Sequence, residues 1–465
     1  MLDPKWYMRV AISLTAIAMS QPKVAIIAVA SRFEQGVDET EGWMDLAVRT
    51  LKQQGVDVLA VKPVLTDRSN TEPVIAQLKS EKFDLLVVMN GTWAADSLQI
   101  DVIREFSTPR LLWAVPYAKT FSLASIQHLG SVLKQLEISF SYVYGAPDDE
   151  NVAQKILRQA KISRLANLWN GMRVGKIGRR FTWRTMGPAD ITYDELDLQL
   201  AAGPNPVHID LDELFDLVGK VPDSQAKQLI DTLRKNGKLG NVEVKEKALV
   251  EAAKVYFAQE ELIKKYHLDA VTVECYPKYG GLDNLASAWL AEEGIVSVDE
   301  GDLGHTALWR IMQELSGKPV ALTEPVMIER DGSLILRHEG SGAPSLSEQI
   351  SEVSLKPVTE EAGVVILSSI RPGPVTLATV WGRNRKYRMS ILLGNAVRLS
   401  KTEVEKYGGG LAARIKFNIP ADKLVDRMIE LGVDHHLMLT PGNIAQELVD
   451  FCKMTGIEPV APDLQ

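Results

Sequence analysis

Residues 23–31, KVAIIAVAS, form a nearly continuous apolar run that ends in a serine. Three further runs of this kind follow along the chain: VDVLAVKPV (56–64), FDLLVVMNG (83–91) and RLLWAVPY (110–117). Amphipathic segments such as 43–55 and 71–81 separate them. Unbroken Val, Ile and Leu runs are typical of strands buried on both faces, so this alternation predicts a parallel sheet covered by helices, a Rossmann-like domain over residues 23–165. No G-x-G-x-x-G motif follows the first run, so the fold alone does not indicate a nucleotide.

A second Rossmann-like parallel-sheet domain is predicted over residues 166–350. Its strand-like segments alternate with helical ones, among them a long helical stretch at 223–267. The strand-like segments are MRVGKIGRRF (172–181), NPVHID (205–210), DAVTVECYP (269–277), GIVSVDEGD (294–302) and GKPVALTEPV (317–326). Open parallel sheets bind ligands outside the carboxyl ends of their strands. Several acidic residues lie at such ends, and we therefore expect the functional site in this region.

The texture of the sequence changes in the last region, residues 351–465. Segment 362–400 has short strand-like runs with turn residues and no long helix between them, which favours antiparallel pairing. Two helical patterns then flank a His-His pair in segment 421–457. The predicted fold class is α/β, with two Rossmann-like domains, a smaller β-rich C-terminal domain, and an N-terminal extension at 1–22.

Bulk composition excludes some classes of protein. A net charge of −8 and a pI near 5.6 argue against a nucleic-acid surface, which would be basic. Cys275 and Cys452 are the two cysteines of the chain, so a reducing cytoplasm fits best. Arg9 and the apolar run after it are similar to a short signal peptide, which leaves export as the alternative. No run is long enough for a membrane helix.

A group of acids and histidines closes the apolar segments of the second and third regions. Asp299, Glu300 and Asp302 follow one strand-like run, and Glu324 lies near the end of another. Clustered carboxylates at a buried strand end are costly, because burial and like charge both oppose ionisation, and a cation would relieve that cost. The histidines that close such segments or follow a helix are His338, His435 and His436. Two carboxylates with two imidazoles suit Mn²⁺, Co²⁺ or Mg²⁺.

Several of these segments resemble the L-arabinose isomerase and L-fucose isomerase-like superfamily. The resemblance lies in EGDLGHTALWRIMQELSGKPVALTEPV (300–326), LILRHEGSGAPSL (334–346), RPGPVTLATVWGRNRKYRMSILLGNA (371–396) and VDHHLMLTPG (433–442). The order of two α/β domains and a β-rich one also agrees, whereas the N-terminal domain matches mainly in pattern.

The resemblance implies a metal-dependent aldose–ketose isomerase that works through an enediolate. By position, Glu300, Glu324, His338 and His436 match the family's metal ligands, and Mn²⁺ is the expected ion. Glu300 and Glu324 would also move the proton between the two substrate carbons, in an order that the sequence does not fix. Asp302 is expected to orient a ligand.

The resemblance further implies a homotrimer or homohexamer with active sites at subunit boundaries. Segment 120–130, TFSLASIQHLG, is the candidate for a substrate-facing segment from a neighbouring subunit, and it would give His128 a role. A surface helix histidine is the alternative interpretation.

The substrate is expected to be a hexose, deoxyhexose, pentose or anionic sugar such as a sulfonated one. Guanidinium groups favour carboxylate, phosphate or sulfonate, and the basic candidates are Lys176, Arg179, Arg180, Arg371 and Arg383. An ordinary solvated basic loop is the alternative for 176–180. Further candidates for substrate contact are Glu274, Tyr276 and His435.

Two other functions remain open from the sequence. Two Rossmann-like lobes and a signal-like start suit a non-enzymatic sugar-binding protein that closes by a hinge. Such a protein does not need two acids and two histidines on one cation. A metal-dependent lyase or aldolase would use the same enediolate chemistry.

Overall fold

The computed structural model describes residues 21–178, 192–201, 203–274, 281–340, 342–358 and 363–460. The chain divides into two compact units, which we call the N-terminal unit (up to Leu168) and the C-terminal unit (from Trp169). The finer domain boundaries expected from the sequence stay predictions.

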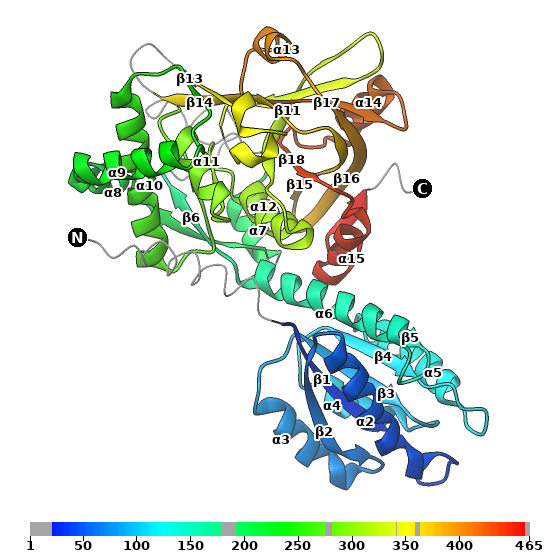
Figure 1. The fold of residues 1–465 in the computed structure, drawn as a ribbon. Helices are drawn as coiled ribbons and strands as arrows, with labels where there is room; N and C mark the ends of the chain where they lie inside the picture. Colours follow the sequence, from blue (N-terminus) through cyan, green and yellow to red (C-terminus); the bar gives the residue numbers. More distant parts are fainter. Residues whose placement is uncertain are drawn as a thin grey trace. The chain divides into compact units, whose positions relative to one another are not determined.

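The N-terminal unit contains a five-stranded parallel sheet of strand order β2-β1-β3-β4-β5 (Figure 1). Its strands are β1 (Lys23–Val29), β2 (Asp57–Leu65), β3 (Leu85–Asn90), β4 (Arg110–Ala114) and β5 (Ser141–Tyr144). The helices are α2 (Val37–Gln53), α3 (Thr71–Lys79), α4 (Asp96–Ile103), α5 (Ser122–Gln135) and α6 (Glu150–Gly171), the last of which runs into the C-terminal unit. This is the order of a doubly wound sheet.

The unbroken apolar run of β1 is explained by burial on both faces of this sheet. Val24 and Ile26 belong to one buried cluster, and Ala25 and Ile27 belong to another. Successive side chains of a strand point to opposite faces, so a strand between two layers of helices needs apolar residues at every position.

A second parallel sheet lies in the C-terminal unit, in the order β10-β9-β6-β7. Its strands are β6 (Arg173–Ile177), β7 (Asn205–Ile209), β9 (Ala270–Val273) and β10 (Ser297–Val298). The helices of this region are α7 (Glu195–Leu200), α8 (Leu211–Lys220), α9 (Asp223–Lys235), α10 (Glu246–Tyr266), α11 (Asn284–Glu292) and α12 (Leu303–Ser316). The helical stretch expected at 223–267 is thus two helices, because Gly237 turns the chain with a φ of 65°.

The rest of the C-terminal unit is built on a ten-stranded, mainly antiparallel sheet. Six of its strands close on themselves in the order β16-β15-β18-β11-β12-β17 and back to β16, and we call this ring the barrel. They are β11 (Ala321–Ile328), β12 (Leu334–His338), β15 (Gly373–Arg383), β16 (Lys386–Val397), β17 (Leu411–Phe417) and β18 (Leu437–Pro441). Outside the ring are β8 (Asn241–Val242), β13 (Ser354–Pro357), β14 (Val364–Ser369) and β19 (Glu458–Val460). Helices α13 (Lys401–Lys406), α14 (Ala421–Leu431) and α15 (Ala445–Thr455) complete the region.

The parallel sheet and the barrel share one buried core. Val273 of β9, Leu285 of α11 and Leu439 of β18 belong to the same hydrophobic cluster. The predicted fold class is confirmed: two parallel sheets and a C-terminal antiparallel β region. One strand is placed differently from our expectation, because β11, which carries Glu324, pairs in the barrel and not in the parallel sheet. It forms a hairpin with β12, and antiparallel neighbours need only a short connection.

Among the described residues, no helix has the length and apolar character that crossing a membrane requires.

Candidate metal centre

The connection between β10 and α12 carries three acids into a buried position. Glu300 adopts a φ of 68° and Gly301 one of 64°, so both lie in the left-handed region. This conformation costs a residue with a side chain on the order of 1–3 kcal/mol, and such strain is concentrated at functional sites. Asp302 then begins α12, where its carboxylate accepts a hydrogen bond from the backbone N–H of His305 at 3.1 Å.

Three neighbouring barrel strands bring the other candidate ligands together. In the register, Thr323 of β11 lies opposite Leu437 of β18, and Glu324 lies opposite Arg337 of β12. His436 directly precedes β18 and His338 ends β12. The pairing therefore places Glu324 between the two histidines, although the three residues are far apart in sequence.

The polar atoms of the four predicted ligands lie close to one another. Glu300 Oε2 is 3.0 Å from His436 Nε2, and Glu300 Oε1 is 3.4 Å from His338 Nε2. Glu324 Oε1 is 3.6 Å from His436 Nε2. Ligand atoms held about 2.1 Å from one ion are about 3 Å apart when adjacent and about 4 Å apart when opposite. The spacing of these oxygen and nitrogen donors thus fits a divalent cation.

A buried carboxylate fixes the orientation of His436. Asp302 Oδ2 accepts from His436 Nδ1 at 2.6 Å, which directs Nε2 toward Glu300. Burial opposes charge on this fully buried ring, but hydrogen bonds with Asp302 and Glu300 outweigh it and raise the pKa of His436 well above its ordinary value. Burial likewise opposes ionisation of Glu300, yet hydrogen bonds with His338 and His436 hold its pKa well below the ordinary value. These interactions favour a proton between His436 Nε2 and the Glu300 carboxylate. A metal ion can take the place of that proton.

His338 has two competing partners at its other nitrogen. The backbone N–H of Gly340 donates to Nδ1 at 3.0 Å, and Asp299 Oδ2 lies 3.7 Å from the same atom. Burial opposes charge on the ring, but Asp299 and Glu300 outweigh it and raise the pKa of His338 to about 9. To bind a cation through Nε2, the ring must carry its proton on Nδ1 and donate it to Asp299. Asp299 packs so closely on the chain that a Cβ at Gly340 would lie 1.6 Å from its Oδ2.

His435 takes part in a separate chain of contacts at the more open side of the cluster. Its Nδ1 lies 2.9 Å from Asp434 Oδ1, and its Nε2 lies 3.3 Å from Glu324 Oε1. The side chains of His435 and Glu324 are 38% and 34% exposed, whereas that of His436 is fully buried. His435 and Glu324 are therefore the members of the cluster that solvent or a substrate can reach most easily.

Three groups of these residues have ligand atoms close enough to hold a metal ion. They are Asp302–His305–His436, Glu324–His435–His436 and Asp299–Glu300–His338, each with its atoms within 4.8 Å of one another. His436 is common to two groups and contacts Glu300 of the third. The residues present therefore fit a metal ion, and we call the set the candidate metal centre.

Sequence reasoning missed several members of this neighbourhood. His305 donates from Nδ1 to Asp302 Oδ2 at 2.7 Å, and its Nε2 lies 2.7 Å from Thr379 Oγ1. The three-residue step from the helix-capping Asp302 to His305 was a usable signal, since a capping side chain reaches that position. Asp434 was also missed, although its position directly before the His-His pair was a usable signal. Two contacts had no sequence signal: that of His305 with Thr379, and that of Asp302 with the hydroxyl of Tyr193. Each joins segments more than 70 residues apart.

Asp283 is a further buried acid beside the centre. Neither carboxylate oxygen has a hydrogen-bond partner in the described structure. Burial, followed by the charges of Asp299 and Glu300, raises the pKa of Asp283 well above its ordinary value. The surroundings of this side chain therefore disfavour its charged form.

The candidate substrate residues have different fates. Glu274 is 3% exposed and packs against Gly178, where a Cβ would lie 2.4 Å from its carboxylate. His128, in the N-terminal unit, is 56% exposed and pairs with Asp96 at 2.7 Å. Lys176 is not a solvated loop cation, because it is 1% exposed on β6 and contacts Glu195. The candidates Arg179, Arg180 and Tyr276 lie outside the described residues.

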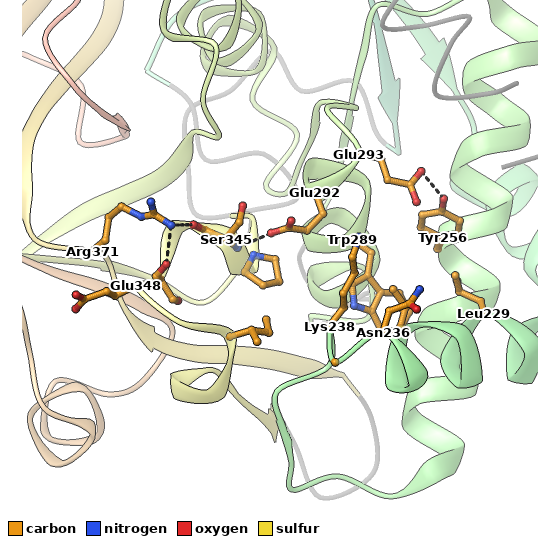
Figure 2. Close-up of a pocket in the computed structure, with 15 residues that line it drawn as sticks. Leu229, Asn236, Lys238, Tyr256, Trp289, Glu292, Glu293, Ser345, Glu348 and Arg371 are labelled. Carbon is orange, nitrogen blue, oxygen red and sulfur yellow. Dashed lines mark hydrogen bonds between the residues drawn. The ribbon is translucent and has the colours of Figure 1, made fainter. Parts of the chain in front are cut away.

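A cavity of about 340 Å³ lies at the other end of α11 from Asp283 (Figure 2). Trp289 and Glu292 of α11 and Glu293, which directly follows the helix, line it, together with residues of the α9–α10 region and of segment 344–350. Arg371, considered above as an anion-binding residue, also lines it and donates to the carbonyl oxygens of Ser345 and Ser347 at 2.7 and 2.9 Å. No member of the candidate metal centre lines this cavity.

The fold and the site together define an α/β protein with a buried carboxylate–histidine cluster at the junction of a parallel sheet and a barrel. No family model matches the chain. The chain is similar to sulfoquinovose isomerases of Priestia aryabhattai and of Priestia megaterium (strain ATCC 12872 / QMB1551), each 22% identical over 446 residues, which are 91% of this chain and 95% of the relative. It is also 22% identical to the sulfoquinovose isomerase of Clostridium sp. (strain MSTE9) over 395 residues, 80% of this chain and 85% of that protein.

Proposed function

We propose that the protein is a metal-dependent aldose–ketose isomerase acting on sulfoquinovose or a closely related anionic hexose. The observation that carries the proposal is similarity to proteins named sulfoquinovose isomerase over nine-tenths of the chain. The carboxylate–histidine cluster supports it independently, because its donors fit a divalent cation. Membership of the L-arabinose isomerase and L-fucose isomerase-like superfamily is part of the same proposal.

In this proposal Glu300, Glu324, His338 and His436 hold the cation, with Mn²⁺ expected and Co²⁺ or Mg²⁺ as alternatives. When bound, the cation supplies Lewis-acid polarisation of the sugar's carbonyl and neighbouring hydroxyl. Asp302 keeps His436 in the tautomer whose Nε2 lone pair faces the site. Asp299, 3.7 Å from His338 Nδ1, would do the same for His338 once it replaces the Gly340 N–H as the partner of that nitrogen.

Glu324 is our candidate for the group that moves the proton between carbon 2 and carbon 1. Its side chain is 34% exposed against 16% for Glu300, so a substrate reaches it more easily. Burial opposes its ionisation, but the hydrogen bond with His435 outweighs burial and lowers the pKa of Glu324, which leaves a carboxylate ready to accept a proton. Glu300, held between two histidines, is the candidate for the second acid–base group.

Recognition of the sugar's anionic group is assigned by this proposal to Arg179 and Arg180, with Tyr276 and Glu274 at the pocket wall. Active sites at subunit boundaries of a trimer or hexamer in the cytoplasm, with His128 contributed by a neighbour, complete the proposal. A protein that is monomeric by light scattering and fully active would remove the proposed role of His128.

The test is a panel of sugars incubated with Mn²⁺-loaded protein and followed by NMR. Sulfoquinovose should give its ketose, and quinovose, which has a methyl group in place of the sulfonate-bearing carbon, should react much more slowly. A lyase or aldolase would give two shorter fragments, and a binding protein would return the sugar unchanged. Either outcome would overturn the proposal.

A further inference from the structure

Two consecutive residues far from the His-His pair in sequence reach both of its supporting carboxylates. Tyr193 donates its hydroxyl hydrogen to Asp302 Oδ1. Thr192 donates its hydroxyl hydrogen to Asp434 Oδ2. Both residues lie just before Asp194, the residue that caps the short helix α7, and their partners lie on other segments of the C-terminal unit.

Each of these carboxylates uses its other oxygen on one histidine of the pair. Asp302 Oδ2 lies 2.6 Å from His436 Nδ1, and Asp434 Oδ1 lies 2.9 Å from His435 Nδ1. The Nε2 atoms then face Glu300 and Glu324, at 3.0 and 3.3 Å. Two adjacent hydroxyls are thus connected, through two carboxylates, to two adjacent imidazoles.

The two arms differ in burial. Tyr193 is 2% exposed and Asp302 fully buried, so water does not compete for the hydroxyl–carboxylate bond. The Tyr193 hydroxyl also accepts from the backbone N–H of Gly304, and a Cβ at that glycine would lie 2.9 Å from the hydroxyl oxygen. Thr192 is exposed, although Asp434 is buried. The tyrosine arm should therefore carry the larger effect.

We propose that Thr192 and Tyr193 are positioning residues that set the two histidines for separate tasks. Tyr193 acts through Asp302 on His436 and thereby on metal affinity. Thr192 acts through Asp434 on His435 and thereby on the contact with Glu324 and the rate of proton transfer. The inference rests on the proposed function, in which His436 is a metal ligand and Glu324 moves the proton.

The tyrosine arm is tested by metal binding to the metal-free protein, measured by calorimetry with Mn²⁺. Tyr193→Phe should weaken binding about 10- to 100-fold, the usual effect of losing a group that orients a metal ligand. Tyr256→Phe is the matched control, because Tyr256 is equally buried and donates to a carboxylate, Glu293, at 2.8 Å, away from the candidate metal centre. This control should bind Mn²⁺ like wild type, and thermal unfolding of both variants measures any general loss of stability.

The threonine arm is tested by turnover at saturating Mn²⁺. Thr192→Val should lower kcat about threefold to tenfold with metal affinity unchanged, and Thr192→Ser, which keeps the hydroxyl, should restore it. In a double-mutant cycle, the effect of Thr192→Val should vanish in a His435→Ala background, because the hydroxyl acts through that ring.

The outcomes separate this inference from the proposed function. Wild-type protein that binds no Mn²⁺ would overturn both. Wild-type binding with Tyr193→Phe within twofold of it would overturn the tyrosine arm and leave the proposed function standing. Additive effects of Thr192→Val and His435→Ala would show that Thr192 does not act through His435, and would overturn the threonine arm.

Discussion

The two parallel sheets of this protein end very differently at their carboxyl edges. In the five-stranded sheet of the N-terminal unit, β3 ends in Asn90, which is fully buried, and the next loop exposes Trp93 to 38%. In the four-stranded sheet of the C-terminal unit, β9 leads to Glu274 and β10 to Asp299 and Glu300. Within the described residues, the groups able to hold a metal belong to the C-terminal unit alone.

The difference teaches that a parallel sheet edge is not sufficient to gather a metal centre. The β10–α12 connection supplies Glu300 and Asp302, but Glu324, His338 and His436 come from barrel strands or their ends. In the described structure, the N-terminal unit has no barrel beside its parallel sheet, although the strand order of that sheet is equally suited to ligand binding. The barrel strands and their ends thus carry three of the four proposed ligands.

The largest effect is expected from the proton-moving acid of the barrel. Glu324→Gln should lower isomerisation about 10²–10⁴-fold, because the amide cannot accept the substrate proton. Metal content should stay close to wild type, since the amide oxygen still coordinates. The assay is exchange of the carbon 2 hydrogen with solvent deuterium, with metal occupancy measured in parallel. Exchange at the wild-type rate with full metal would remove Glu324 from this role and make Glu300 the first candidate.

A pair of histidine variants compares the two units directly. His436→Ala should weaken Mn²⁺ binding by about 100-fold or more. Losing a group that only orients a metal ligand typically lowers metal affinity about 10- to 100-fold, and this variant removes the buried ligand itself. His128→Ala, in the N-terminal unit, should leave Mn²⁺ affinity unchanged and raise only the KM for sugar if a neighbour uses it. Equal loss of metal affinity in both variants would contradict the assignment of the centre to the C-terminal unit.

Two glycine substitutions sharpen the same comparison. A Cβ at Gly340 would lie 1.6 Å from Asp299 Oδ2, and one at Gly91 would lie 2.1 Å from Thr40 Oγ1. Each alanine variant should lose about 1–3 kcal/mol of stability through overpacking. Gly340→Ala should also weaken Mn²⁺ binding, because Asp299 must move from His338, whereas Gly91→Ala should not. Urea unfolding and calorimetry measure the two effects, and unchanged Mn²⁺ affinity in Gly340→Ala would show that Asp299 does not support the site.

A pH dependence of stability is expected in the metal-free protein. The pKa of His338 is raised to about 9, above the ordinary value of 6.5, so its stabilising contribution is complete below about pH 6.5 and is lost as the pH rises through about 9. The loss is at most about 3.5 kcal/mol, since one pKa unit corresponds to about 1.4 kcal/mol. The free energy of unfolding of wild type minus that of His338→Gln should therefore fall over this range. A difference that does not change with pH would contradict the charge interaction with Asp299 and Glu300.

Sequence patterns predicted the layers of the fold because burial on both faces leaves a direct record in the strands. The run KVAIIAVAS became β1, with alternate residues in two buried clusters. The placement of β11 was missed, because its short apolar run does not record which sheet it joins. Polar residues near the ends of such runs singled out Glu300, Glu324, His338 and His436. Their polar atoms lie near one another, and their role as metal ligands stays a prediction.

Residues that support the site from a distance left weaker traces. Tyr193 contacts Asp302 and Thr192 contacts Asp434, in each case across more than 100 residues of sequence. A hydroxyl residue in a loop has no sequence feature that identifies such a partner. His305 was within reach of sequence reasoning, because it follows the cap of α12 by three residues. Periodic apolar patterns can be recognised in the sequence alone. Contacts between residues of remote segments can be identified only in the three-dimensional structure.

The central claim is that this chain interconverts an anionic aldose and its ketose only with a divalent cation at the carboxylate–histidine cluster. The most direct measurement is NMR of sulfoquinovose in D₂O with metal-free protein, verified by elemental analysis, before and after addition of Mn²⁺. We expect no conversion without metal, and with Mn²⁺ we expect ketose formation accompanied by deuterium at the exchanging carbon. Full turnover by metal-free protein, or no turnover of sulfoquinovose and related aldoses with Mn²⁺ bound, would contradict the account.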